Sequence, residues 1–425
     1  MTSATLILTM AALLVISVPV AVTLGLTGIA FVLNDAHMSL LVVPQQLFIG
    51  LDKYPLAAIP FFILAGNLME TGGISQRLID FAKSIVGGLS GGLALTCVLT
   101  CMIFAAVSGS SIATVFAIGS ILIPAMVRHG YPPAFAAALM ATSAELGVII
   151  PPSIPMILLG VSAELSIGEL FIAGIGPGLL IGGALLAVTW IICRTRGYGR
   201  NDGEDRRSIG VAARRAAFAL GLPVVILGGI YGGLFTPTEA SAVAVVFALV
   251  IGTLIHRELG LKEVYAALHR SAISAAAIML LVATAAFLGY LINRAGLPTQ
   301  LGNWLNTTFD TPTTYLLSVN AALFVVGMFI ETGAAILVLG PLLTPVAVNF
   351  GIDPIHFGII IIVNLALGMV TPPFGVNLFA ACQVANVSVL QIVRHLGPFV
   401  ATVFVCLLII TFVPSIALAL RDLVY

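Results

Sequence analysis

Two short polar interruptions in the apolar sequence carry residues that could bind a small cation. The first is the string SGSS, which holds Ser108, Ser110 and Ser111, and the second is the string ETG at residues 331–333. Hydroxyl and carbonyl oxygens are the ligands that hard cations prefer. One such string more often serves helix packing in membranes, but two matching strings favour an ion site.

Each interruption is followed by a helical segment that Gly and Pro break. The first break is the string GVIIPPSIP at residues 147–155, and the second is GMVTPPFGVN at residues 368–377. Pro152 and Pro373 donate no backbone hydrogen bond and clash with the preceding turn, which frees nearby carbonyls. Half-helix N-termini beyond such breaks attract carboxylates. Irregular backbone inside a membrane is tolerated where it lines a cavity, so we expect interruptions and breaks to meet near the membrane midplane.

An internal repeat relates the two sets of motifs. Shifting the sequence by 221 positions aligns Gly147 with Gly368 and Pro152 with Pro373, within a series of Gly and Pro matches that starts at residue 119. Fourteen of the seventeen Lys and Arg residues fit one topology on the cytoplasmic side. That topology places residue 128 inside and its repeat mate 349 outside. The repeats are therefore predicted to be inverted, a symmetry common in secondary transporters.

The composition indicates which elements must position these motifs. The chain has 425 residues, of which 60% are hydrophobic and 8% charged, and its mean hydropathy is +1.18. Soluble domains carry roughly 25% charged residues, and ~20 helical residues cross a bilayer. The sequence therefore predicts an all-α polytopic membrane protein with re-entrant hairpins and broken helices. Its 17 basic and 17 acidic residues balance, which leaves no basic patch for nucleic acid.

The apolar runs divide the chain into five predicted segments. Residues 1–89 and 216–312 form scaffold helices, and residues 194–215 form an arginine-rich cytoplasmic loop. The two transport repeats cover residues 90–193 and 313–425, and each contains a hairpin, a broken helix and a closing helix. The predicted ranges are 90–127, 133–163 and 170–193 in the first repeat and 313–350, 355–385 and 396–419 in the second. Residues 6–30 are predicted to form one retained first span.

Four acidic residues lie in or near apolar segments, where a carboxylate indicates function by default. For Glu331, at the second interruption, a role in the cavity and a role as a helix cap are equally open. Glu145 precedes the first break by two residues and is expected to support it or relay a proton. Glu239 follows Thr236 in a capping pattern, and Glu70 is expected to end the third apolar segment.

Several strings together resemble the large membrane subunit of tripartite ATP-independent periplasmic (TRAP) transporters, essentially from end to end. They are PFFILAGNLMETGG (60–73), SGSSIAT (108–114), PPSIPMILLGV (151–161), AGIGPGLL (173–180), GLFTPTEASAVA (233–244) and TPPFGVNLFAA (371–381). The resemblance implies an elevator-type transporter of the ion transporter superfamily in the bacterial cytoplasmic (inner) membrane. It implies coupling to sodium ions and no other cofactor. It also implies two partners, which are a small four-helix membrane subunit on a separate chain and a periplasmic substrate-binding protein.

The resemblance also assigns the site residue by residue, with many ligands expected from backbone carbonyls. The first sodium site falls on Ser108, Ser110, Ser111, Gly147 and Ile149, and the second falls on Thr332, Gly333, Gly368 and Thr371. The substrate site falls between them, on Pro152, Ser153, Pro373 and Asn377, with Glu145 and Glu331 in supporting positions.

These expectations favour sodium-driven import of an organic acid, such as a C4-dicarboxylate, a sialic acid or another sugar acid. One alternative is an anion carrier or cation/proton antiporter of the same superfamily that needs no binding protein. A membrane-embedded enzyme is disfavoured, because the sequence has no HExxH string and no nucleophile paired with a base. No Lys or Arg lies in the interruptions or breaks, so backbone N–H groups, hydroxyls and Asn377 would meet a carboxylate.

Overall fold

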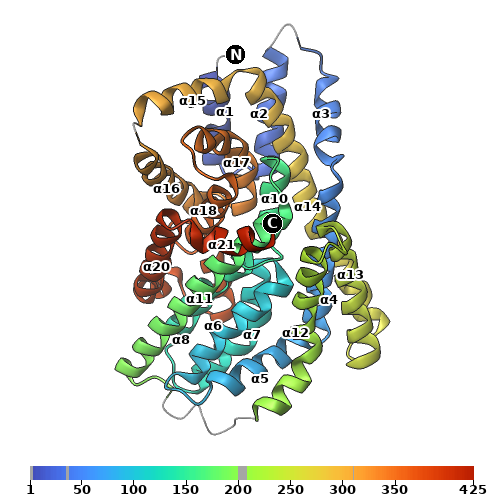
Figure 1. Ribbon diagram of the computed structural model, residues 1–425, viewed down its shortest axis with the longest axis vertical. Helices are drawn as coiled ribbons and strands as arrows, with labels where there is room; N and C mark the ends of the chain where they lie inside the picture. The colour runs from blue at the N-terminus through green and yellow to red at the C-terminus, as the bar shows by residue number, and fades with distance from the viewer. Residues whose placement is uncertain (1–2, 35–37, 200–207, 310) are drawn as a thin grey trace.

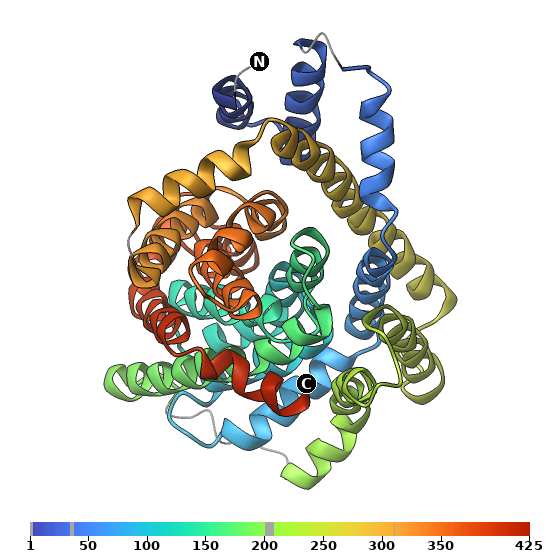
Figure 2. The same cartoon turned by 45° about the horizontal axis from the view of Figure 1, so that its top comes forward.

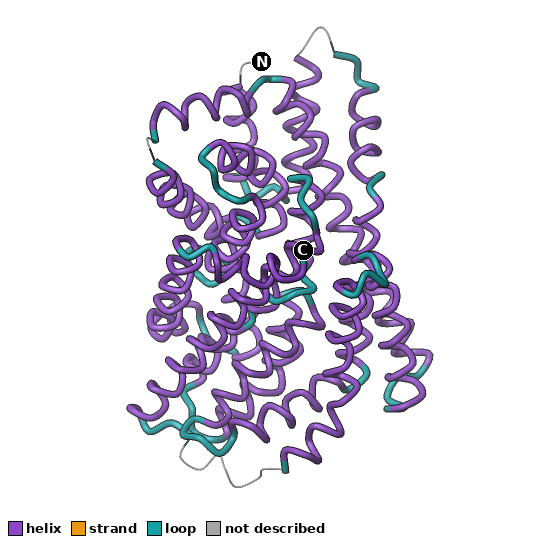
Figure 3. Tube along the Cα trace, in the orientation of Figure 1, coloured by secondary structure: helices purple, strands orange, loops and turns teal. Residues whose placement is uncertain are grey.

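The computed structural model describes residues 3–34, 38–199, 208–309 and 311–425, and every regular element in these ranges is a helix (Figure 3). Eight helices in these ranges are long and apolar enough to cross a membrane, or up to ten spans if two bent helix pairs each count as one. This confirms the prediction of an all-α polytopic membrane protein.

The N-terminal segment corrects one prediction. Residues 6–30 do not form a single span, because α1 (Ser3–Val15) ends before a turn and α2 (Val20–Asn34) begins after it. Ser17 in this turn has a left-handed backbone conformation with a φ of 65°, which is typical of a helix end. Pro19 lacks the N–H group that would continue the first helix. The predicted span is therefore two short helices that pack against each other.

The scaffold is an arc of helices beside the transport core (Figure 2). Besides α2 it contains α3 (Val42–Leu51), α4 (Ala58–Thr71), α5 (Ile74–Val86), α12 (Ile209–Tyr231), α13 (Pro237–Val250) and α14 (Leu261–Arg294), and α15 (Leu297–Thr308) leads to the second repeat. The path from α3 into α4, through the 3₁₀ turn η1 (Tyr54–Ala57), bends by 67°. α14 has 34 residues and packs along α2, α3 and α4, so it ties the scaffold together.

The predicted capping pattern at the start of α13 is present in the structure. Thr236 Oγ1 accepts a hydrogen bond from the Glu239 N–H at 3.3 Å, and the Thr236 N–H donates to Glu239 Oε2 at 2.8 Å. Glu239 therefore has the structural role that the sequence favoured.

The transport core consists of two helix sets in the same order. The first set is α6 (Gly92–Ser108), α7 (Ser111–Arg128), α8 (Pro133–Ser143), α9 (Leu146–Ile149), α10 (Ile154–Ser162) and α11 (Ile167–Arg196). The second set is α16 (Pro312–Phe329), α17 (Thr332–Asn349), α18 (Pro354–Gly368), α19 (Val376–Ala385) and α20 (Val389–Phe412). The hairpins α6–α7 and α16–α17 lie in opposite halves of the molecule (Figure 1). α17 and α18 begin 221 residues after α7 and α8, the offset of the sequence repeat.

The centre of the core is formed by α8 and α18, the first halves of the two broken helices. From Phe135 to Ser143 and from Ile355 to Gly368 every residue is buried. α8 packs on α20, and α18 packs on the hairpin helices α16 and α17. The first break is therefore held inside the molecule, whereas the second break is exposed at Pro373 and Phe374.

The C-terminal end differs from the closing helix predicted at 396–419. α20 begins at Val389 and ends at Phe412, and α21 (Ser415–Val424) is a separate helix that packs on α11. Pro414 lies at the junction, where it cannot donate the backbone hydrogen bond that would continue α20. α21 therefore packs mainly on the first repeat.

Candidate functional site

The first hairpin tip is a tight turn that is fastened to the first helix break. Gly109 has a left-handed φ of +62°, and a Cβ atom there would lie 2.8 Å from the Pro152 carbonyl oxygen. The Gly109 carbonyl accepts a hydrogen bond from the Ile154 N–H at 3.3 Å. Ser110 caps α7, because its Oγ accepts a bond from the Ala113 N–H at 3.4 Å. The tip and the break therefore form one unit.

The second hairpin tip is capped by a carboxylate. Glu331 Oε2 accepts a hydrogen bond from the Ala334 N–H at 3.2 Å, at the start of α17. Glu331 is the repeat mate of Ser110, which performs the same task in the first repeat. Glu331 thus has the capping role that the sequence left open.

Both breaks lie within one helical turn of a glycine that touches a hairpin. A Cβ atom on Gly147 would lie 2.8 Å from the Ser110 carbonyl oxygen, and one on Gly368 would lie 2.4 Å from the backbone of Gly327. Two hydroxyls at the breaks donate to helix carbonyls, from Ser153 to Val148 at 2.6 Å and from Thr371 to Leu367 at 2.8 Å. Their oxygen lone pairs remain able to accept a proton or a cation.

The two repeats meet where the first tip touches the second break. Ser111 Oγ donates to Asn377 Oδ1 at 3.0 Å, and α7 packs along α19. Asn377 is fully buried, and its Nδ2 has no hydrogen-bond partner among the described residues. Thr332 Oγ1 at the second tip is likewise buried and without a partner there. Buried polar groups are rarely left unsatisfied, so these two atoms are positioned to take a ligand.

Two adjoining cavities lie between the tips and the scaffold. One has a volume of about 250 Å³ and lies at both tips; the other, of about 320 Å³, lies at the first tip only. We call them the tip cavities.

Five of the predicted site residues line the tip cavities: Ser108, Ser110, Ser111, Glu331 and Gly333. The other predicted residues lie behind the tips and line neither cavity; they are Glu145, Gly147, Ile149, Pro152, Ser153, Thr332, Gly368, Thr371, Pro373 and Asn377.

Three scaffold residues in the larger tip cavity were missed as site residues. Asn67 and Glu70 come from α4 and Ser274 comes from α14. Asn67 Nδ2 also donates to Ser271 Oγ on α14 at 2.8 Å. Residues three apart share a helix face, so the pairs 67/70 and 271/274 in apolar segments were the available signal. Glu70 does lie at the end of its helix, as expected, but its side chain also faces the cavity.

Glu145 is fully buried next to the first break. Neither of its carboxylate oxygens has a hydrogen-bond partner among the described residues. It lines neither tip cavity, so its supporting role stays a prediction.

The donor set at the tips suits a monovalent cation. No group of three or more His, Cys, Asp or Glu residues is arranged for a metal ion in the part of the chain that the structure describes. Hydroxyls of Ser108, Ser110, Ser111 and Thr332 gather there instead, near the two helix breaks. The residues therefore fit a hard cation that neutral oxygens can bind.

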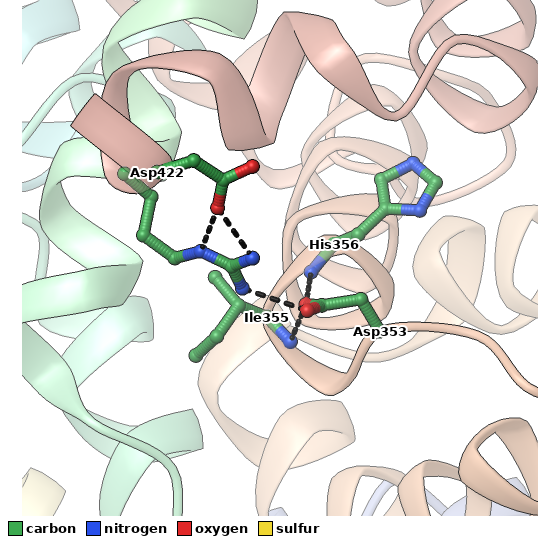
Figure 4. Close-up of polar contacts among 5 residues, drawn as sticks. Asp353, Ile355, His356 and Asp422 are labelled. Carbon is green, nitrogen blue, oxygen red and sulfur yellow. Dashed lines mark hydrogen bonds and ion pairs between the residues drawn. The ribbon is translucent and has the colours of Figure 1, made fainter. Parts of the chain in front are cut away.

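Charge fixes the start of the second broken helix. Asp353 Oδ1 accepts hydrogen bonds from the Ile355 and His356 N–H groups at 2.8 and 3.0 Å, and Asp353 Oδ2 pairs with Arg421 at 2.7 Å (Figure 4). Arg421 also contacts Asp422 at 2.7 Å. Burial opposes ionisation of Asp353, but the Arg421 guanidinium and the helix N–H groups outweigh it and lower its pKa. α21 is thereby anchored to α18.

The chain matches the family model described as "Tripartite ATP-independent periplasmic transporter, DctM component" over residues 7–416. It is 40% identical to the C4-dicarboxylate TRAP transporter large permease protein DctM of Rhodobacter capsulatus, with 97% of each chain covered. It is 36% identical to the sialic acid TRAP transporter large permease protein SiaM of Vibrio cholerae, with 97% of this chain and 95% of that one covered.

A third relative is longer than this chain. The isethionate TRAP transporter permease protein DctMQ of Oleidesulfovibrio alaskensis is 44% identical over 95% of this chain, which spans 64% of that protein. Among solved structures, the YdaH transporter of Alcanivorax borkumensis has a similar fold, with a TM-score of 0.61, 17% identity and 89% of each chain covered. These relatives are named as transporters, not as enzymes.

Proposed function

The chain belongs to the DctM family of tripartite ATP-independent periplasmic transporters, and from this premise we propose that it is the permease of a sodium-coupled importer of a small organic acid. It is a multi-pass protein of the bacterial cytoplasmic (inner) membrane. The membership confirms the resemblance of the sequence motifs. What we propose beyond the family membership is the coupling ion, the substrate class and the two partners.

The observation that carries the proposal is the meeting of both tips in one cavity. Ser110 and Ser111 from the first repeat and Glu331 and Gly333 from the second line it together. The cavity lies between the core and α14 of the scaffold, where Ser274 completes the polar lining. A site between two bodies changes its access when one body moves past the other, as in transporters built from inverted repeats. We propose such an elevator movement of the core.

Sodium fits the neutral oxygens at the two tips. On this proposal the hydroxyls of Ser108, Ser110 and Ser111 with carbonyls near Gly147 and Ile149 hold one ion. Thr332, Gly333, Gly368 and Thr371 hold the other. The unpartnered Thr332 Oγ1 supports the second assignment. A bound cation would also offset the charge of an anionic substrate in a membrane interior of low dielectric.

A carboxylate would be bound without a basic side chain. The unpartnered Asn377 Nδ2 and the adjacent Ser111 hydroxyl are donors close to the tips. Pro152, Ser153 and Pro373 shape the backbone there. Three relatives are named for a C4-dicarboxylate, sialic acid and isethionate. Each of these compounds carries an anionic group, which the donors near the tips could bind.

The proposal includes two partners, a small membrane subunit and a periplasmic binding protein. The DctMQ name of one relative, of which this chain spans 64%, supports a small subunit outside these residues. The competing function is an anion carrier or cation/proton antiporter that works alone. Reconstitution into liposomes separates them: uptake should require both partners and an inward sodium gradient. Sodium-dependent uptake by this chain alone would contradict the proposal.

A further inference from the structure

A separate cavity of about 260 Å³ lies between scaffold and core, away from the tips. Its walls come from α3 and α14 on the scaffold side and from α10 and α17 on the core side, in the upper half of Figure 1. The side chains able to donate or accept hydrogen bonds in its lining are Gln46, Lys53, Ser162, Glu164, Tyr290 and Asn293. Because Lys53 is its only cationic lining residue, we call it the Lys53 cavity.

Lys53 lies at the bend between α3 and α4. Its Nζ donates a hydrogen bond to the Val161 carbonyl at 3.2 Å, in the last turn of α10. An ammonium group has three donors, and this is the one hydrogen bond that the Lys53 side chain makes with the described residues. Lys53 also forms no ion pair there, although Glu164 lines the same cavity. Lys53 is exposed, so its two other donors are open to solvent or to a ligand that enters the cavity.

The remaining lining suits a small organic anion. Amide groups of Gln46 and Asn293 and hydroxyls of Ser162 and Tyr290 can donate to a second oxygen, while Val282 and Leu337 supply apolar surface. Glu164 is the acidic group of the lining, and its exposed position at the end of α10 keeps it in high dielectric.

Two helices connect the Lys53 cavity with the tip cavities. α10 lines the tip cavities with Ile154 near its start and lines the Lys53 cavity with Val161 near its end. At 1.5 Å per residue these positions are about 10 Å apart along the helix. α14 lines both with one face, from Ser274 at the tips to Asn293 at the Lys53 cavity. The Lys53 cavity and the tip cavities therefore lie one after the other along the same interface between scaffold and core.

We propose that the Lys53 cavity is a carboxylate-binding station on the outer side, which the substrate occupies before it reaches the tips. The inference rests on the proposed function, because it takes the substrate to be an organic acid. Lys53 falls on the outer side in the topology that the basic residues predict. Its ammonium binds the carboxylate, and the amides and hydroxyls orient it.

A cysteine-protection experiment tests the station without requiring transport. A Cβ atom on Gly289, which lines the Lys53 cavity, meets nothing within 4 Å, so Gly289→Cys fits the structure. Cys382 is half-buried and is replaced by Ala to remove its background, while the other four cysteines are buried. The purified protein in detergent is labelled with a maleimide in the presence of succinate or sialic acid. Either acid should slow the labelling of Cys at 289.

The Lys53 variants identify the group that binds. Lys53→Met should raise the concentration for half-protection about tenfold, which corresponds to about 1.4 kcal/mol, because it removes a charge-assisted hydrogen bond. Lys53→Arg should restore protection to within about twofold, since it keeps the charge. Arg294→Gln is the matched control, because Arg294 follows Asn293 in sequence but does not line the cavity; it should leave protection unchanged.

Three results would overturn the inference. They are no protection by either acid, equal protection in Lys53→Met, and a labelling rate in Lys53→Met that already differs without any acid. The last result would assign Lys53 to holding scaffold and core together through Val161. Protection that persists in a complex without sodium-dependent uptake would reject the proposed function and leave the station in place.

Discussion

Ser108 and Ser153 in the first repeat have Phe329 and Phe374 as their mates in the second. The two serines are 5% and 1% exposed, whereas the two phenylalanines are 56% and 55% exposed and their ring centroids lie 5.9 Å apart. One backbone hydrogen bond still joins tip and break in each repeat, from Ile154 to Gly109 and from Phe374 to Met328, although the second bond is displaced by one and two residues from the repeat mates of the first. The link between tip and break is therefore kept in both repeats, while the first repeat carries more of the polar chemistry.

Close backbone contacts at the two breaks provide the most severe test of this symmetry. Gly368→Ala would place a Cβ atom 2.4 Å from Gly327 backbone, and Gly147→Ala would place one 2.8 Å from the Ser110 carbonyl oxygen. Because backbone cannot yield as a side chain does, we expect losses of about 3 and about 1–2 kcal/mol. Thermal unfolding in detergent would show whether Gly368→Ala loses more stability than Gly147→Ala. Gly183→Ala, where a Cβ meets nothing within 4 Å, should not destabilise the protein; equal losses at all three positions would refute the contact argument.

The sodium dependence tests whether the two tips are chemically equivalent. Thr332→Ala removes a buried hydroxyl that has no partner in the described chain. If that oxygen binds sodium, the sodium concentration for half-maximal uptake should rise about tenfold. Ser108→Ala should have a similar effect at the first tip, and the double variant a larger one with normal expression. An unchanged sodium response in the double variant would remove both assignments.

The helix caps test whether Ser110 and Glu331 are interchangeable as mates. Ser110→Ala and Glu331→Ala should each lower the free energy of unfolding by about 1 kcal/mol, because each removes a cap. Glu331→Ser should restore stability, since serine caps the mate position. Thermal unfolding gives these values, and uptake assays show whether the carboxylate has a further role. If Glu331→Ser stays as unstable as Glu331→Ala, the capping role is wrong.

The smallest expected effect concerns the starts of the broken helices. Asp353 caps α18 and pairs with Arg421, whereas its mate Pro132 offers no side-chain cap to α8. Asp353→Asn keeps a capping residue and removes the charge, so it should cost about 0.5 kcal/mol for a partly exposed pair.

The pH dependence of this pair has a definite sign. The pKa of Asp353 is lowered in the folded protein, so the pair stabilises the fold above the ordinary aspartate pKa of about 3.9. Its contribution disappears as the pH falls through the lowered value. The difference in thermal stability between the native chain and Asp353→Asn should be constant near neutral pH. It should shrink toward zero in acid. A difference that grows in acid would contradict the assignment.

Much of the fold could be predicted because Gly, Pro and charge act locally. Pro occupies the first position of both α8 and α18, and it fixes where each helix begins. The hairpins share the same offset because Gly and Pro recur at matching positions. Ser17 is a counterexample, since a left-handed serine leaves no signal in an apolar run and α1 and α2 were merged.

The candidate site was predictable only on the core side. Its hydroxyls and breaks are local strings, but Asn67 meets Ser271 across 204 residues of sequence, and Lys53 meets Val161 across 108. Such contacts depend on how scaffold and core pack, which no periodicity in one segment specifies. Glu331 was ambiguous because a carboxylate at a tip can cap a helix and line a cavity, and here it does both.

The length of α14 has a consequence for the surrounding lipid. Its 34 residues extend over about 50 Å, whereas the hydrocarbon layer is about 30 Å thick. Such a helix must tilt or project from the membrane, and bilayer thickness acts on its angle. Because one face of α14 lines both the tip cavities and the Lys53 cavity, a change in its tilt with bilayer thickness would shift a wall of both at once.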